Sequence, residues 1–204
     1  MTPDPISAAI LAGGRARRLG GVDKSALAVG AGSILERQLS LLRDLTPHIL
    51  IVGADRSRVP AGGVRVVADR LPGAGPLGGL YTALMEAPTE QVLVIACDMP
   101  FLTAPFLMRL AARGVDVDVA VPRSAAGRHP LCASYARRAA GHLKARIDGG
   151  DLRVREALEG LDVRELGPDE LAGFDPDGLL LLNVNTPDDY AKARTAALTP
   201  PPTA

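Results

Sequence analysis

The 204-residue sequence has no tryptophan, only two cysteines and no excess of charge of either sign. Its 23 basic side chains are balanced by 23 acidic ones. We therefore do not expect a general nucleic-acid-binding protein, because such proteins carry an excess of positive charge. No apolar run approaches the roughly 20 residues that a membrane-spanning helix needs, so we expect no membrane association.

We also expect neither a secretion signal nor a thiol metal motif. Residues 1–5 carry no cationic segment of the kind that opens a signal peptide. Cys97 and Cys132 do not have the spacing of a metal site. We expect both to be buried, reduced thiols, which places the protein in the cytoplasm.

What the sequence does contain is an alternation of short apolar runs with segments of helical period. Strands are predicted at 6–12, 48–53, 64–68, 91–97, 117–122, 131–135 and 179–184. Helices are predicted at 33–45, 77–87, 103–113, 136–148, 151–159 and 187–197. This alternation predicts an α/β fold, a mostly parallel (mixed) sheet with helices on both faces. We expect one domain, residues 1–199, and a disordered proline-rich tail, 200–204.

Two of the predicted helices have capping patterns at their first residues. Ser33 is followed three positions later by Glu36, which is the pattern of a capping box. Thr186 precedes Pro187 and two carboxylates, a sequence that suits the positive end of the last helix.

Ligands of parallel sheets bind beyond the carboxyl ends of the strands, which here points to loops 12–25, 69–79 and 97–102. The first loop has two pairs of glycines, which let backbone N–H groups approach a ligand closely. It also carries Arg15, Arg17, Arg18 and Lys24. Free N–H groups beside several cations suit a polyphosphate. The alternative is a solvated surface turn.

This first loop is not one of two better-known phosphate loops. A Walker loop has a glycine before its lysine, whereas Asp23 precedes Lys24 here. The dinucleotide pattern G-x-G-x-x-G is also absent from it.

The second glycine-rich segment, Asp69 to Gly79, does contain G-x-G-x-x-G, at Gly73, Gly75 and Gly78. Asp98 follows about twenty positions later, as in dinucleotide-binding proteins. A domain that binds NAD or a flavin is therefore a rival interpretation. Pro76 argues against it, because a proline removes a backbone donor from the loop. Asp69 itself has the alternative role of a turn residue.

Three further positions carry side chains suited to a binding site. Asp98 follows the apolar run 92–97, and a carboxylate there needs a partner, for which Mg²⁺ is suitable; its alternative role is an N-cap or turn. Asn183 and Asn185 would share one face of a strand and could ligate a hydrated cation or bind a polar substrate, or they could cap the next helix. His129 could bind an anionic acceptor or a loop carbonyl.

Together these segments resemble the molybdenum cofactor guanylyltransferase family (molybdopterin-guanine dinucleotide biosynthesis protein A). The matching segments are Leu11 to Gly14 with Arg18, Gly20 and Lys24; Asp69 to Gly79; Cys97, Asp98 and Pro100; Arg128 to Pro130; and Asn183 to Pro187. They occur in the family's order over nearly the whole chain. The resemblance implies a single-domain, Rossmann-like nucleotidyltransferase fold.

The resemblance also implies an activity, the transfer of GMP from GTP to the terminal phosphate of molybdopterin or Mo-molybdopterin, with release of pyrophosphate. The implied catalytic residues are Arg18, Lys24 and Asp98. The implied GTP-binding residues are Leu11, Ala12, Gly13, Gly14, Arg18, Lys24, Asp69 and Asp98, with Asp69 reading the base. The implied acceptor-binding residues are Gly78, Gly79, Arg128, His129, Asn183 and Asn185. Asp98 would hold Mg²⁺.

One position departs from the family pattern, because Gly53 stands where many members carry an asparagine after the second strand. The alternatives are a molybdopterin cytidylyltransferase, a sugar-phosphate nucleotidyltransferase and a regulatory nucleotide-binding domain. We expect a monomer or a weak homo-oligomer, and a handover of the pterin from molybdenum cofactor insertion proteins.

Overall fold

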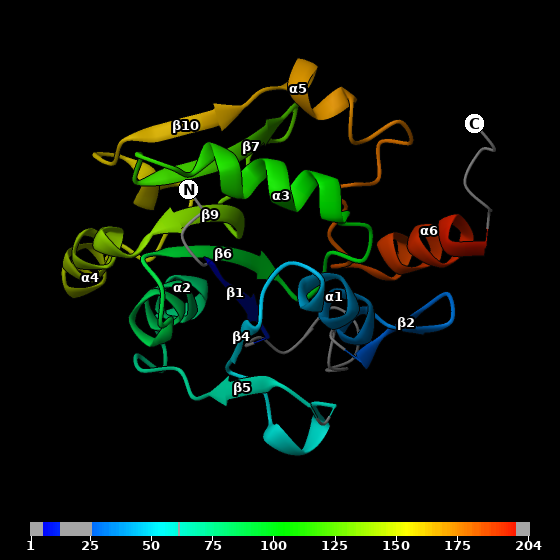
Figure 1. Ribbon diagram of the computed structural model, residues 1–204, viewed down its shortest axis with the longest axis horizontal. Helices are drawn as coiled ribbons and strands as arrows, with labels where there is room; N and C mark the ends of the chain where they lie inside the picture. The colour runs from blue at the N-terminus through cyan, green and yellow to red at the C-terminus, as the bar shows by residue number, and fades with distance from the viewer. Residues whose placement is uncertain (1–5, 13–25, 61, 199–204) are drawn as a thin grey trace.

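The computed structural model describes residues 6–12, 26–60 and 62–198 (Figure 1). The strands of its main sheet are β1 (Ile6–Leu11), β4 (His48–Val52), β5 (Val64–Val67), β6 (Gln91–Ala96), β7 (Val119–Ser124), β8 (Gly127–Arg128), β9 (Cys132–Ala136) and β10 (Val163–Leu166). A separate hairpin consists of β2 (Ala28–Val29) and β3 (Gly32–Ser33). The α-helices are α1 (Ile34–Arg43), α2 (Gly75–Glu86), α3 (Ala104–Arg113), α4 (Ala140–Asp148), α5 (Pro168–Ala172) and α6 (Pro187–Leu198). The 3-10 helices are η3 (Arg56–Arg58), η4 (Arg137–Ala139) and η5 (Glu156–Leu158).

The main sheet runs in the order β10-β7-β9-β6-β1-β4-β5, with β8 paired to β7. Its centre is parallel: Ile10 of β1 lies between Ile51 of β4 and Ile95 of β6. β9 runs antiparallel to both β6 and β7. The sheet is therefore mixed but mostly parallel, and the predicted fold class is confirmed.

Side chains of β1 alternate between two apolar layers, as expected of a buried strand. Ala8 and Ile10 belong to the cluster formed with α1 and α3, whereas Ala9 and Leu11 belong to the cluster formed with α2 and α4. Helices thus cover both faces of the sheet. Because the faces alternate residue by residue, the register of β1 is fixed by burial on each side.

A third, smaller apolar cluster lies beside the end of the sheet. It joins the β2–β3 hairpin to α6, which lie next to each other in Figure 1, through Val29, Val184 and Ala193. The Tyr190 hydroxyl donates to the carbonyl of Ala28 at 3.0 Å. This cluster brings the segment before α6 back to the centre of the fold, beside the end of β6.

The predicted strand at 179–184 is wrong. Oδ1 of Asp175 accepts hydrogen bonds from the amides of Leu179 (2.7 Å) and Leu180 (2.8 Å), and the amide of Leu182 donates to the carbonyl of Leu179. These amides therefore bond to Asp175 and within a turn, and the segment continues as irregular chain rather than as a strand.

The predicted helix at 151–159 is also wrong, since only the 3-10 helix η5 forms there. Gly150 has a φ of 77°, in the left-handed region that ends α4. After it, the carboxylate of Asp151 is bonded to Arg146 at 2.5 Å and to Arg153 at 3.1 Å. The sequence analysis also missed β10, α5 and the β2–β3 hairpin, which are short.

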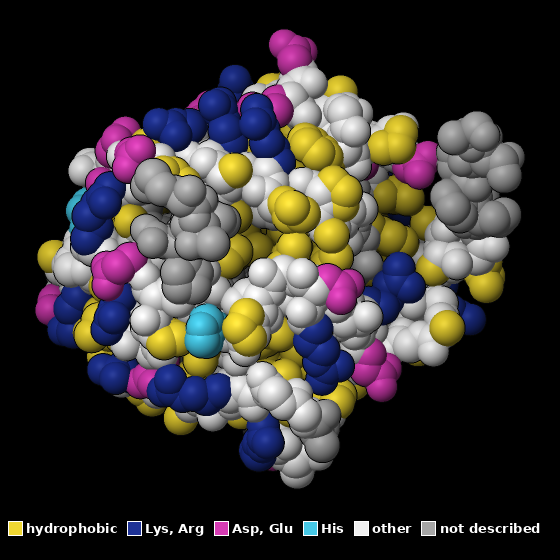
Figure 2. Space-filling model, viewed as in Figure 1, with side chains coloured by type: hydrophobic (Ala, Val, Ile, Leu, Met, Phe, Trp, Pro, Cys, Tyr) yellow, Lys and Arg dark blue, Asp and Glu magenta, His cyan; other side chains and the backbone are white. Residues whose placement is uncertain are grey.

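The surface carries charges of both signs. Figure 2 shows Lys and Arg side chains interspersed with Asp and Glu side chains over one face of the molecule. None of the helices in the described part of the chain is long and apolar enough to span a membrane.

Candidate active site

A cavity of about 700 Å³ opens at the carboxyl ends of β1, β4 and β6, beside the first turn of α2. The predicted site residues in its lining are Leu11, Asp69, Gly79, Asp98, Arg128, His129, Asn183 and Asn185. The predicted site residues Gly13, Gly14, Arg18 and Lys24 lie outside the described residues. Loops that are far apart in the sequence, at 69–79 and 97–102, therefore meet at one cavity, as the strand-end rule predicts.

The backbone at the ends of β1 and β6 continues the pairing of the sheet. The Cys97 amide donates to the Leu11 carbonyl at 3.2 Å, and the Ala12 amide donates to the Val52 carbonyl at 2.9 Å. The Leu11 carbonyl and the Ala12 amide are thus already bonded within the protein. If Leu11 and Ala12 recognise a base through the backbone, they would have to use backbone groups other than the Leu11 carbonyl and the Ala12 amide.

The turn that carries Asp98 is fixed from two sides. Gln38 is a buried residue of α1, and its side-chain nitrogen Nε2 donates to the carbonyls of Ala96 (2.8 Å) and Met99 (3.1 Å). On the other side, the Val184 amide donates to the Asp98 carbonyl at 2.8 Å. Asp98 is half-buried and lines the cavity. Its backbone is therefore held independently of any ligand.

Asn183 and Asn185 line the cavity on either side of the fully buried Val184. Their predicted common orientation is confirmed although the segment is not a strand, because Val184 is anchored in the third apolar cluster. At the start of the following helix, the backbone amide of Asn185 donates to Oδ2 of Asp189 at 3.0 Å. Thr186 and Asp189 cap α6: Oδ2 of Asp189 accepts from the Thr186 amide at 2.8 Å, and the Thr186 hydroxyl accepts from the Asp189 amide at 3.1 Å.

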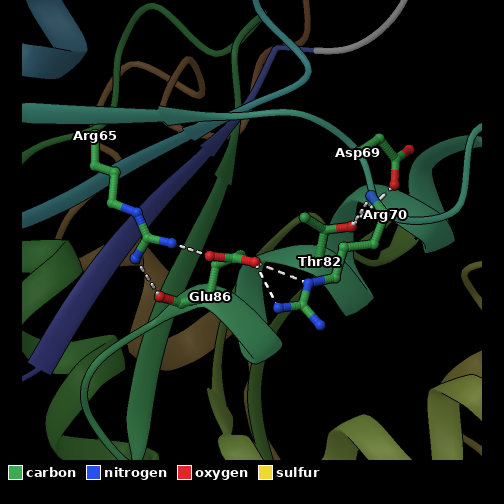
Figure 3. Close-up of polar contacts among 5 residues, drawn as sticks. All are labelled: Arg65, Asp69, Arg70, Thr82 and Glu86. Carbon is green, nitrogen blue, oxygen red and sulfur yellow. Dashed lines mark hydrogen bonds and ion pairs between the residues drawn. The ribbon is translucent and has the colours of Figure 1, made fainter.

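Asp69 is both a turn residue and part of the cavity wall. Its Oδ1 accepts from the Leu71 amide at 3.0 Å and from the hydroxyl of Thr82 at 2.9 Å. The same hydroxyl accepts from the Arg70 amide at 2.9 Å (Figure 3). One of the two carboxylate oxygens, Oδ1, is therefore held by the turn and by the helix α2 that follows it.

The glycines between Asp69 and α2 serve the backbone geometry. Gly73 and Gly75 have φ angles of 97° and 61°, in the left-handed region where glycine is favoured. A side-chain carbon at Gly78 would lie 2.8 Å from the Leu71 carbonyl and 3.2 Å from Oδ2 of Asp69. Gly78, predicted to bind the acceptor, is therefore packed against this turn and is not in the cavity lining, whereas Gly79 is.

The basic side of the cavity is formed by the β7–β9 region. Nε of Arg128 donates to Oε1 of Glu165 at 2.7 Å, and Nε of Arg123 donates to Oε2 of Glu165 at 2.7 Å. The hydrogen bond from Arg128, with a further contribution from Arg123, lowers the pKa of Glu165 against the opposing effect of burial. Part of the positive charge of Arg128 is thus balanced by Glu165.

His129 is half-buried beside Arg128. Its Nε2 lies 2.7 Å from the hydroxyl oxygen of Ser124. Burial, together with the nearby charge of Arg155, lowers the pKa of His129 below its ordinary value. Its ring is therefore neutral at neutral pH, and Arg155, which also lines the cavity, is a cation that the sequence analysis did not find.

Comparison with known proteins identifies the family. A model of the MobA-like NTP transferase domain matches residues 8–163, more than half of the chain. The chain belongs to the MobA-like NTP transferase family. It is 38% identical to the molybdenum cofactor guanylyltransferase of Mesorhizobium japonicum, over 92% of this chain and 94% of that protein. It is 36% identical to the probable molybdenum cofactor guanylyltransferase of Chloroflexus aggregans, over 90% of this chain and 91% of that protein.

A solved structure agrees with this membership. The molybdopterin-guanine dinucleotide biosynthesis protein A of Archaeoglobus fulgidus is 28% identical, with a TM-score of 0.81 over 93% of this chain and 97% of that chain. The resemblance inferred from the sequence is confirmed, and the chain is a nucleotidyltransferase. The match to the MobA-like domain includes Asp69, Asp98 and His129; Asn183 and Asn185 lie beyond it.

Gly53, the departure from the family pattern, also lines the cavity of this MobA-like chain. Its φ is 79°, and its amide donates to the Val67 carbonyl at 2.9 Å. Asparagine is the residue that most readily adopts this left-handed conformation after glycine. The backbone here therefore suits either residue, and glycine leaves this part of the wall without a side chain.

Two further polar residues of this MobA-like site were not predicted from the sequence: Thr82, which donates to Asp69, and Gln38, which donates to the carbonyls of Ala96 and Met99 on either side of Asp98. Both are polar residues that their helices, α1 and α2, bury against the core of the protein. Gln38 is flanked at helical spacing by Leu35 and Leu42, which are buried. A polar residue inside such an apolar stripe was the available indication.

Proposed function

We propose that the protein transfers GMP from GTP to the terminal phosphate of molybdopterin or Mo-molybdopterin, forming the guanine dinucleotide cofactor and pyrophosphate. An oxygen of the acceptor phosphate attacks the α-phosphorus of GTP. The bond from this phosphorus to the bridging oxygen breaks, and pyrophosphate leaves. The attacking group is already an anionic phosphate, so no nucleophile is needed from the protein.

The nucleotide would lie in the cavity, over the carboxyl ends of β1 and β6. In this proposal, Asp69 accepts hydrogen bonds from N1–H and N2–H₂ of guanine, and Leu11 to Gly14 contact the nucleotide through the backbone. Arg18 and Lys24, as cations of the same loop, would hold the β- and γ-phosphates and stabilise the leaving pyrophosphate. Cytosine offers no such pair of adjacent donors, so an acceptor at position 69 favours guanine.

Asp98 is the proposed Mg²⁺ ligand, with Asn183 and Asn185 as neighbours in the same metal region or on the acceptor. All three residues line the cavity and carry side-chain oxygens. Mg²⁺ is usually held by one or two carboxylates with water and substrate phosphates. Within the described residues, no group of three or more His, Cys, Asp or Glu side chains is placed to hold a metal. Mg²⁺, when bound, would neutralise phosphate charge.

The acceptor would bind in the part of the cavity lined by Arg128 and His129, with Gly79, which lies beside Leu11, at the boundary with the nucleotide. The α2 helix begins beside this region, and its N-terminal N–H groups carry partial positive charge. Arg155 adds a cation there. A doubly charged phosphate is the kind of group that such a surface binds.

The observation that supports the proposal most strongly is that Asp69 and Asp98, from separate loops, line one cavity in a chain of the MobA-like family. We further propose that the protein works in the cytoplasm as a monomer or weak homo-oligomer. Molybdenum cofactor insertion proteins would hand the pterin over to it.

The test is turnover by the purified protein, supplied with molybdopterin under anaerobic conditions and followed as pyrophosphate release. We expect release with GTP and Mg²⁺, and little with GTP in excess EDTA or with CTP. Faster release with CTP would make it a cytidylyltransferase. Release with GTP and a sugar 1-phosphate, but not with molybdopterin, would contradict the proposed acceptor.

A further inference from the structure

The carboxylate of Asp69 is held in one orientation by α2. Thr82, in the middle of this helix, is fully buried, and its hydroxyl reaches Oδ1 of Asp69 at 2.9 Å across the turn (Figure 3). The Leu71 amide reaches the same oxygen at 3.0 Å. A carboxylate oxygen has about two acceptor positions, so both positions of Oδ1 are occupied.

The direction of the Thr82 hydroxyl proton follows from its two partners. The Arg70 amide, 2.9 Å from the Thr82 oxygen, can only donate. The hydroxyl therefore accepts from Arg70 and directs its single proton to Asp69. The hydrogen bonds therefore run from Arg70 to Thr82 and from Thr82 to Asp69. A residue without a hydroxyl at position 82 would lose both of them.

Oδ2 of Asp69 is in a different situation. It points away from Thr82 in Figure 3, and among the described residues it takes part in no hydrogen bond. The absence of a side chain at Gly78 leaves room beside it, since a carbon there would lie 3.2 Å away. Asp69, which lines the cavity, thus has one oxygen bonded to the protein and one that takes part in no hydrogen bond among the described residues.

We propose that Thr82 is a positioning residue for base selectivity: it holds Oδ1 of Asp69 so that Oδ2 alone reads the nucleobase. This inference rests on the proposed function, in which Asp69 accepts from guanine. Guanine can direct both N1–H and N2–H₂ to Oδ2. Cytosine would place its N3 lone pair beside that oxygen, and a fixed carboxylate could not turn to avoid the repulsion.

The experiment compares the dissociation constants of GTP and CTP, each with Mg²⁺, by isothermal titration calorimetry on the full chain. Thr82→Val keeps the shape of the side chain and removes the hydroxyl. We expect the ratio of the CTP constant to the GTP constant to fall about tenfold, the change that corresponds to one hydrogen bond of ordinary strength. Thr82→Ser, which restores the hydroxyl, should return the ratio to within about twofold of the wild type.

The matched control is Glu86→Gln, four residues further along the same helix. Glu86 is ion-paired to Arg65, and to Arg70 at 2.6 Å, on the edge of the same network (Figure 3). This variant weakens the attachment of α2 to β5 but keeps both hydrogen bonds to Oδ1. Its selectivity ratio should equal that of the wild type, even if its melting temperature falls.

Asp69→Ala distinguishes a failure of the proposed role of Asp69 from a failure of the proposed role of Thr82. If it leaves the ratio unchanged, Asp69 does not read the base, and both the proposed role of Asp69 and this inference fail. If it abolishes selectivity while Thr82→Val does not, the role of Asp69 stands and the inference is overturned. A loss that Thr82→Ser fails to restore, or an equal weakening of GTP and CTP, would also overturn it. Should Thr82→Val not fold, Thr82→Ala gives the same comparison.

Discussion

Polar residues that line the cavity are held by partners behind them. Asp69 is bonded to Thr82, Arg128 to Glu165, and His129 to Ser124. Such contacts fix the direction of a side chain before a ligand arrives. Fixed polar groups stabilise developing charge at little cost in reorganisation, which is what a reaction between two anionic phosphates requires.

The residue that should matter most for turnover is Asp98. We predict that Asp98→Asn lowers the rate of pyrophosphate release by at least about 100-fold, because the variant loses the charge that anchors Mg²⁺. The fold should persist, since the Asp98 backbone carbonyl, not its side chain, accepts from Val184. The control is Asp188→Asn, which removes an exposed carboxylate from the start of α6. Near wild-type release by Asp98→Asn at ordinary Mg²⁺ would rule out the metal role.

His129 should make stability depend on pH. Burial and Arg155 lower its pKa in the folded chain, so the unfolded chain binds a proton at pH values where the folded chain does not. By linkage, the folded state loses stability as pH falls below the ordinary pKa of about 6.5. We predict that His129→Gln loses less stability than the wild type between pH 7.5 and 5.5.

Urea unfolding at both pH values measures this difference. The exposed His48 provides the control, because His48→Gln should keep the pH dependence of the wild type. An identical loss of stability in His129→Gln and in the wild type would show that His129 is not the group responsible.

At the scale of the elements, α1 holds the turn that carries Asp98, although the residues of α1 lie outside the cavity lining. Gln38 donates to two carbonyls that bracket Asp98, and Nε of Arg37 donates to the carbonyl of Pro100 at 3.3 Å. The helix itself begins with the predicted capping box, in which Ser33 and Glu36 exchange hydrogen bonds. A well-capped helix is a rigid support for the turn it holds.

We predict that Gln38→Leu, which leaves the buried carbonyls of Ala96 and Met99 without this donor, destabilises the fold by about 1–3 kcal/mol. It should also lower turnover by about 10- to 100-fold, since a small misplacement of a catalytic group has effects of that size. The Mg²⁺ concentration for half-maximal activity should rise, which a purely structural defect would not cause. Ser40→Ala, at an exposed position of the same helix, should change neither quantity. Unaltered Mg²⁺ dependence in Gln38→Leu would argue against the positioning role.

The elements that the sequence predicted well are those whose local pattern agrees with their environment. The run before Asp98 is buried on both faces and formed β6, and the Ser33–Glu36 pair capped α1. The run Leu179–Leu182 is also apolar but forms no strand, because the side chain of Asp175, four residues before it, accepts from the amides of Leu179 and Leu180. Composition could not reveal that competition.

The same limit applies to the site. Asp69 and Asp98 could be found because acidic residues at strand ends follow a rule of the fold. Arg155 could not, because it reaches the cavity only through the irregular segment between α4 and η5. Thr82 and Gln38 act through residues far away in the sequence, and their partners became evident only from the packing of helix against loop.

At the scale of the whole molecule, the fold collects segments from most of the chain at one edge of one sheet. The order of the strands places β1 between β4 and β6, so the loops after all three open on the same side. The third apolar cluster then returns the asparagine segment, residues 183–185, to that edge. A site assembled in this way can contact two substrates through residues from separate segments of the chain.

The most direct test of the account is a crystal structure of the protein with Mg²⁺ and a non-hydrolysable GTP analogue. We predict the analogue in the cavity at the ends of β1 and β6, with guanine on Oδ2 of Asp69 and Mg²⁺ between Asp98 and the phosphates. An analogue bound elsewhere on the molecule, or in this cavity with its metal away from Asp98, would contradict the account.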